Sequence, residues 1–221
     1  MPGPNHSSLP LPPDASLSFS RAETTCATVL FADLRGYTGL AEVLQPVRVA
    51  GLLDEFFDVL TRATERNGGE VFHMAGDSMM AGFGIGAPLH RCAREALNAG
   101  HAMLRNFAPI GLRWRQELAV DTGIGIGVHQ GEVAICLHGP SGRQARTLVG
   151  DTVNVAARLC GRARAGEVLF SAAVASALEA DGPPEKAGAP MQILHLPQLR
   201  LRGRSALIDI WCVPAAKRVL L

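Results

Sequence analysis

The pattern of apolar and polar positions along the first third of the chain predicts one buried strand followed by helices. The run from Ala27 to Leu34 is short, apolar and partly β-branched, which is typical of a strand inside a sheet. From about Val47 to Arg66, apolar residues recur at helical spacing and form one face. Asn67-Gly68-Gly69 ends this helix, because Asn and Gly tolerate the left-handed conformation after a helix.

Paired apolar runs in the middle of the chain predict two β-hairpins. The first joins residues 70–75 to residues 78–83, and the second joins residues 118–128 to residues 132–137. A helix from Pro88 to about Ala108 is expected between them. Because strands and helices are mixed in this way, we expect a mostly antiparallel sheet with helices packed over it.

The last third of the chain completes an α+β pattern. Residues 138–146 are polar and contain Gly and Pro, which indicates a loop or an arm, and a helix is expected over residues 151–164. Residues 167–171 predict a strand, and two further strands flank the Arg202-Gly203-Arg204 turn. A ferredoxin-like βαββαβ core fits inside this order, and the C-terminal strands extend it.

Composition supports one globular domain with a full hydrophobic core. Of the 221 residues, 48% are hydrophobic and 19% are charged. We expect a disordered Pro/Ser-rich leader over residues 1–25, a domain over residues 26–214 and a short tail over residues 215–221. The net charge of +1 argues against a protein that binds nucleic acid through bulk charge. No apolar run approaches the roughly 18 residues of a membrane span, and the five scattered cysteines favour a cytoplasmic protein.

Two aspartates lie where predicted strands end. Asp33 follows an apolar run, and Asp77 lies in the turn of the first predicted hairpin. In a βαββ core the first strand lies beside that hairpin, so both carboxylates can converge on one point. Carboxylates at close range suit Mg²⁺ or Mn²⁺, and two such metals favour in-line displacement at phosphorus. The alternative is a turn-forming aspartate at each position.

A polar helix face is expected near the start of the helix over residues 151–164. Asn154 and Arg158 are four residues apart, so they share one face of a helix. Arg offers a forked, permanently charged group that matches phosphate, and Asn both donates and accepts hydrogen bonds. The alternative is an ordinary solvated helix face.

Three stretches together resemble one known family. Residues 31–38 (FADLRGYT), the Gly76-Asp77 step and residues 149–158 (VGDTVNVAAR) are similar to the catalytic domain of class III nucleotidyl (adenylyl/guanylyl) cyclases, and they occur in the family's order. The resemblance extends over roughly residues 25 to 213. It implies a homodimer with two composite active sites at the interface.

In each site, the resemblance implies that Asp33, Asp77 and Leu34 of one subunit form the site for two divalent cations, Mg²⁺ or Mn²⁺. The other subunit contributes Asn154, which orients the ribose, and Arg158, which stabilises charge on the transferring phosphate. Arg202 falls where the family places a basic residue against the terminal phosphates. The run after Asp33 leads into a short helix, and its backbone N–H groups are suited to bind phosphate. The substrate contacts expected there are Leu34, Gly36, Tyr37 and Thr38.

One departure from the family's pattern concerns the nucleotide base. Adenylyl cyclases of the family usually carry Lys four residues before the second metal aspartate, where this chain has His73. Seven residues before Asn154 it has Thr147, which resembles a bacterial subgroup, whereas guanylyl cyclases typically have Glu and Cys at these two places. A neutral His and a Thr each donate or accept, so the penalty that rejects the wrong base is weakened. We expect ATP to be preferred over GTP, with modest discrimination; the alternative for His73 is a buried strand histidine beside Phe72.

The resemblance therefore predicts an adenylate cyclase that makes cyclic AMP and pyrophosphate from ATP. One alternative is a guanylate or dual-specificity cyclase. Another is a catalytically silent, dimeric regulatory domain, which the loss of the base-contacting Lys would favour. A regulatory partner acting in trans is also compatible with the sequence. Gly123, Gly125 and Gly127 alternate along a predicted strand and indicate close backbone approach or a dimer contact.

Overall fold

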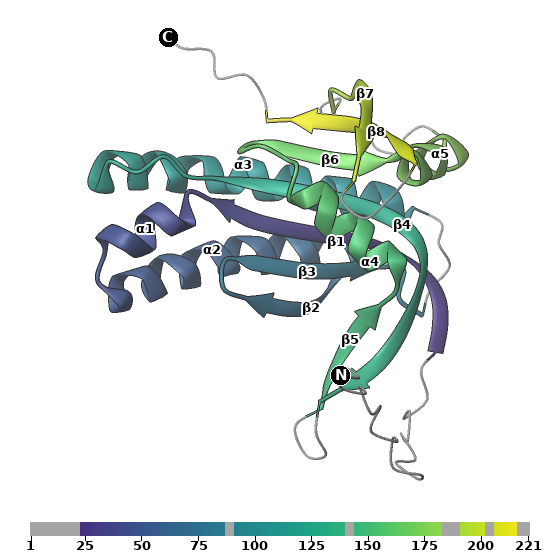
Figure 1. The fold of residues 1–221 in the computed structure, drawn as a ribbon, viewed down its shortest axis with the longest axis horizontal. Helices are drawn as coiled ribbons and strands as arrows, with labels where there is room; N and C mark the ends of the chain where they lie inside the picture. The colour runs from purple at the N-terminus through teal and green to yellow at the C-terminus, as the bar shows by residue number, and fades with distance from the viewer. Residues whose placement is uncertain (1–22, 87–90, 140–143, 183–190, 202–205, 216–221) are drawn as a thin grey trace, which may run out of the picture.

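The computed structural model describes residues 23–86, 91–139, 144–182, 191–201 and 206–215. Within these ranges the chain forms one sheet of eight strands and five helices (Figure 1). The elements are β1 (Glu23–Arg35), α1 (Tyr37–Val43), α2 (Pro46–Arg66), β2 (Glu70–Ala75), β3 (Ser78–Phe83), α3 (Cys92–Leu118), β4 (Gly123–His138), β5 (Ala145–Val149), α4 (Asp151–Cys160), β6 (Glu167–Ser171), α5 (Ala172–Ala180), β7 (Leu194–Arg200) and β8 (Leu207–Pro214). No helix in these ranges is long and apolar enough to span a bilayer.

The sheet has the predicted α+β topology. Its strand order is β2-β3-β1-β4-β6-β8-β7, with β5 paired to β4 outside this path. Every neighbouring pair is antiparallel except β4 with β6. The order β2-β3-β1-β4, with helices between β1 and β2 and between β3 and β4, is the ferredoxin-like core, which β6, β7 and β8 extend. The expectation of a mostly antiparallel sheet with a C-terminal β extension is confirmed.

Alternating residues of β1 pack on opposite faces of the sheet. Leu30 and Leu34 lie in the main core beneath α2 and α3, which also contains the fully buried Trp114. Val29 lies in a second cluster on the other face, together with Ala156 of α4. Figure 1 shows the same layering, with α2 and α3 behind the sheet and α4 in front of it. Because side chains alternate along a strand, Asp33 lies on the α4 face.

The second predicted hairpin is wrong, because residues 123–138 form one continuous strand. β4 pairs with β1 over the whole length of β1, from Glu23 opposite Ile135 to Arg35 opposite Gly123. Gly131, which falls between the two expected strands, instead makes room for α4, since a Cβ there would lie 2.7 Å from the Thr152 Oγ1 atom. A long partner strand and a close helix therefore keep this glycine in the sheet.

Two other boundaries differ from the prediction. α3 continues through Pro109 to Leu118, because the residues beyond the proline still have a core to fill, including the fully buried Trp114. β5 begins at Ala145 and pairs with the end of β4, within the segment expected to be a loop or arm. In Figure 1 this pair projects away from the rest of the sheet, as an arm would.

The ends of the domain also differ in detail. β1 begins at Glu23, which lies inside the segment expected to be a leader, and the part of that leader before it falls outside the described residues. α4 ends at Cys160 instead of continuing to 164, with Gly161 following it. The Arg202-Gly203-Arg204 turn falls outside the described residues, between β7 and β8.

Candidate active site

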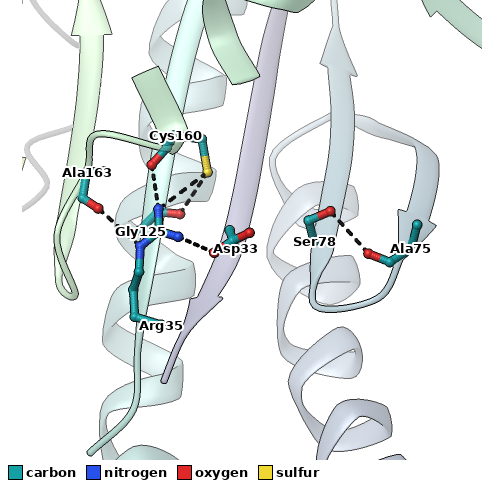
Figure 2. A network of polar contacts seen from close by, with 7 residues as sticks. All are labelled: Asp33, Arg35, Ala75, Ser78, Gly125, Cys160 and Ala163. Atoms are coloured by element: carbon teal, nitrogen blue, oxygen red, sulfur yellow. Dashed lines mark hydrogen bonds and ion pairs between the residues drawn. The ribbon is translucent and has the colours of Figure 1, made fainter. Parts of the chain in front are cut away.

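Asp33 of β1 and Asp77 of the β2–β3 turn lie close together. Asp33 is the third residue from the end of β1, and it pairs with Ser78, the first residue of β3. Asp77 precedes Ser78 in the β2–β3 turn, and its carbonyl oxygen accepts a hydrogen bond of 3.0 Å from the Leu34 N–H. The Ser78 hydroxyl donates to the Ala75 carbonyl across this turn, at 3.1 Å (Figure 2). The predicted convergence of the two aspartates follows from this strand register.

The surroundings of the Asp33 carboxyl disfavour its negative charge. Burial raises the pKa of Asp33 above its ordinary value, the Arg35 guanidinium opposes this rise, and the nearby Asp77 carboxylate adds to it. Two carboxylates that repel each other at one sheet edge are stabilised by a cation between them. Hard oxygen donors of this kind fit Mg²⁺ or Mn²⁺, so the residues present suit the expected divalent metals.

The run after Asp33 makes a tight turn into α1. Leu34 is buried in the main core and its N–H already donates to the Asp77 carbonyl oxygen, so its carbonyl oxygen is the group left as a candidate ligand. Gly36 caps α1 at a φ of 87°, and a Cβ there would lie 2.4 Å from the Asp121 carbonyl oxygen, so only glycine fits. Tyr37 packs against the main core, whereas Thr38 is exposed.

α4 presents the predicted polar face. Its buried residues are Thr152, Val155, Ala156, Leu159 and Cys160. Asn154 is exposed and Arg158 is half-buried on the opposite side of the helix. Within the described part of the chain, neither side chain makes a hydrogen bond or an ion pair. This face is therefore available to a ligand or to a second subunit.

The two expected base contacts lie on different strands. His73 pairs with Met80 across β2 and β3, and it is exposed, so its interpretation as a buried strand histidine is wrong. Met80 packs in the cluster on the α4 face, and residues directly opposite in an antiparallel pair share a face, so His73 shares this face with Asp33. Thr147 is half-buried in β5, opposite Cys136. Arg202, the last expected contact, falls outside the described residues.

Arg35 is a site residue that sequence reasoning missed. It lies two residues after Asp33 in the same strand, and its guanidinium forms an ion pair with the Asp33 carboxylate (Figure 2). The signal was present in the sequence, because residues i and i+2 of a strand lie on the same face. The predicted strand ends at Leu34, one residue short of Arg35, so the pattern did not reveal this relation.

The alternating glycines of β4 explain how these groups come so close. A Cβ at Gly127 would lie 2.1 Å from the Cys160 backbone nitrogen, and a Cβ at Gly125 would lie 2.5 Å from the Arg35 Nη2 atom. The prediction of close backbone approach is thus confirmed. The absence of side chains here lets α4 and the Arg35 guanidinium lie directly on β4.

Comparison with known sequences places this arrangement in a family. Residues 19–208 match the family described as the adenylate and guanylate cyclase catalytic domain. The chain belongs to this family. The prediction of a class III cyclase catalytic domain is confirmed, and the paired aspartates and the α4 face lie within the matched region of this cyclase domain.

Two sequence relatives are adenylate cyclases. The cyclase domain is 30% identical to the adenylate cyclase of Anabaena cylindrica over 154 residues, which is 66% of this chain and 29% of that protein. It is 26% identical to adenylate cyclase 1 of Rhizobium meliloti (strain 1021) over 195 residues, which is 87% of this chain and 28% of that protein. The chain therefore spans less than a third of the length of these relatives.

Solved structures share the fold. The adenylyl cyclase CyaB from P. aeruginosa superposes with a TM-score of 0.79 at 25% identity, covering 91% of this chain and 100% of that one. The guanylyl cyclase Cya2 superposes with a TM-score of 0.75 at 24% identity, covering 90% of this chain and 96% of that one. The fold of this cyclase domain is thus shared by an adenylyl cyclase and by a guanylyl cyclase.

Proposed function

We propose that this cyclase domain converts ATP to 3′,5′-cyclic AMP and pyrophosphate, in composite sites between two copies of the chain. The observation that carries the proposal is the proximity of two aspartates: Asp33 lies near the end of β1 on the sheet face that α4 covers, and Asp77 lies beside it in the β2–β3 turn. Asn154 and Arg158 of α4, whose side chains make no hydrogen bond or ion pair within the described residues, support the assignment of a second subunit to complete each site. The adenylate cyclases among the relatives favour ATP as the substrate.

The reaction is an intramolecular displacement at phosphorus. The ribose 3′-oxygen loses its proton to solvent water and forms a bond to the α-phosphorus, and the bond from that phosphorus to the bridging oxygen of the leaving pyrophosphate breaks. Divalent cations held by Asp33 and Asp77 would supply charge neutralisation and would lower the pKa of the 3′-hydroxyl. The protein's own part is to hold the reacting atoms in line and to place charge where it develops.

Each proposed residue has a task in that step. Asp33 and Asp77 provide the carboxylate oxygens, and the backbone from Leu34 to Thr38 faces the phosphate chain. Asn154 of the partner subunit holds the ribose by hydrogen bonds. Arg158 of the partner subunit donates a fork of N–H groups to the α-phosphate as its charge rises.

The experiment that tests this function is product identification. Purified protein with Mn²⁺ should form cyclic AMP from ATP, detected by chromatography against standards, and should form cyclic GMP from GTP more slowly. Asp77→Ala protein purified in the same way is the control for contaminating activity. Folded, dimeric protein that forms no product from either nucleotide would overturn the proposal and favour the silent regulatory domain.

His73 and Thr147 suggest that the preference for ATP is modest. His73→Lys restores a group that only donates, which suits adenine N1 and opposes the N1–H of guanine. We expect the ATP/GTP ratio of kcat/KM to rise about tenfold, since one mismatched polar contact costs about 1–3 kcal/mol. The measurement is initial rates with each nucleotide, and the matched control is His138→Lys at an exposed position of β4.

Two results would contradict this assignment of His73. One is a His73→Lys ratio equal to that of the unaltered protein. The other is a strict preference for ATP that persists in His73→Ala. A preference for GTP in the unaltered protein would instead favour the guanylate cyclase alternative, which the same ambivalent pair of side chains permits.

A further inference from the structure

The Arg35 side chain connects two parts of the site that are far apart in the sequence. Its Nη1 atom donates to the Asp33 carboxylate, its Nη2 atom donates to the Cys160 carbonyl oxygen, and its Nε atom donates to the Ala163 carbonyl oxygen at 3.1 Å (Figure 2). The side chain is 27% exposed. One guanidinium thus spans β1 and the end of α4.

The surroundings are shaped for this guanidinium. A Cβ on Gly125 would lie 2.5 to 2.8 Å from its Nη2, Nε and Cζ atoms, so the group lies flat against the glycine. The carbonyls that it contacts belong to the last residue of α4 and to the turn after it. A helix C-terminus carries partial negative charge and unsatisfied carbonyls, and a cation placed there satisfies both.

The Cys160 side chain contacts both β4 and the Arg35 guanidinium. Its thiol donates to the Gly125 carbonyl oxygen at 3.3 Å, and its sulfur lies 3.9 Å from the Arg35 Nη2 atom. Cys160 and Arg35 therefore fix the same end of α4 on the same residue of β4. In contrast, Asp77 makes no hydrogen bond to Arg35 within the described residues.

We propose that Arg35 is a positioning residue that ties Asp33 to the C-terminal end of α4. The placement of the metal-binding carboxylate and the placement of the helix that carries Asn154 and Arg158 then depend on each other. This inference rests on the proposed function, in which α4 of one chain serves the site whose metals its partner holds. Arg35 would therefore link the metal half of one site to the nucleotide half of the other site in the dimer.

The planar fork of Arg35 is what makes the link. Its N–H groups reach three acceptors in fixed directions, whereas a lysine ammonium is a compact point charge that cannot span them. Arg35→Lys keeps the positive charge beside Asp33 and removes the connection to at least one of the two carbonyls. This one substitution therefore separates the effect of the positive charge beside Asp33 from the effect of the hydrogen bonds to the two carbonyls.

Amide hydrogen exchange of residues 157–164 tests the link without any need for activity. In this turn, the Gly161 N–H donates a hydrogen bond to the Ala157 carbonyl oxygen, and the Ala163 N–H donates one to the Leu159 carbonyl oxygen. In nucleotide-free protein, Arg35→Lys should speed their exchange about tenfold, because charged hydrogen bonds that anchor the turn are lost. Asp33→Ala should speed it as well, although Asp33 makes no hydrogen bond to α4 within the described residues, because Arg35 loses the group that orients it.

Two variants are matched controls for these changes. Asp77→Ala removes a carboxylate that does not contact Arg35, and Arg62→Lys alters an exposed ion pair with Asp58 on α2. Both should leave exchange at residues 157–164 unchanged. Mn²⁺ alone should speed this exchange in the unaltered protein, because the cation draws the Asp33 carboxylate from Arg35, and it should have no effect in Arg35→Lys.

The results distinguish failure of the link from failure of the proposed function. Unchanged exchange in both Arg35→Lys and Asp33→Ala overturns the link, even in an active cyclase. Faster exchange in both variants supports it, even if no cyclic nucleotide is formed. In an active enzyme, Arg35→Lys should also lower kcat more than about tenfold while the KM for nucleotide changes little, and a change confined to KM would contradict a positioning role.

Discussion

A heterodimer of one Asp77→Ala chain and one Arg158→Ala chain should have about half the activity of the unaltered dimer, although each variant alone is nearly inactive. In that heterodimer one composite site receives both defects and the other receives none. Each homodimeric variant should lose about 10²-fold or more in kcat, because metal-assisted charge stabilisation and a forked cation at phosphate are each worth several kcal/mol. The measurement is cyclic AMP formation by heterodimers purified through two different affinity tags.

The matched control pairs two defects of the same kind. A heterodimer of Asp33→Ala and Asp77→Ala chains has a damaged metal pair in both sites, so it should stay inactive. Equal rescue in this control would mean that Asp33 and Asp77 act in different sites, which would contradict their assignment to one metal pair. A lack of rescue in the first heterodimer, with stable association shown by its co-purification, would place the whole active site within one chain.

The site motifs were predictable because each depends on one element or on strands that are neighbours in the sheet. The Asp33 and Asp77 convergence followed from a strand beside a hairpin, and the polar α4 face followed from the four-residue spacing of Asn154 and Arg158. Both are properties of single elements or of adjacent elements. The α+β fold followed for the same reason, since the order of strands and helices restricts a small domain to few topologies.

The errors arose where distant residues override local signals. Gly131 looks like part of a turn, but the length of β1 and the approach of Thr152 keep it inside β4. Pro109 looks like the end of a helix, but the residues beyond it still have a core to fill. Arg35 contacts carbonyls about 125 residues away in the sequence, and no local pattern encodes that separation.

Gly127→Ala should displace α4 and so reduce both stability and activity. The added Cβ would lie 2.1 Å from the Cys160 nitrogen and 2.3 Å from the Ala156 carbonyl oxygen, and both of these are backbone atoms of α4. Backbone cannot rotate away as a flexible side chain can, so the helix itself must shift. Overpacking of this kind costs about 1–3 kcal/mol, occasionally more.

The same shift would move the residues that α4 carries. A displacement of about 1 Å at a catalytic group can lower turnover about 10²-fold, so Gly127→Ala should lose more activity than its loss of stability explains. The matched control is Gly51→Ala, where a Cβ meets nothing within 4 Å and a helix interior gains about 1 kcal/mol from alanine. Denaturant unfolding and cyclic AMP formation would be measured for both. A Gly127→Ala protein with unchanged stability and turnover would show that α4 need not lie this close to β4 for the site to work.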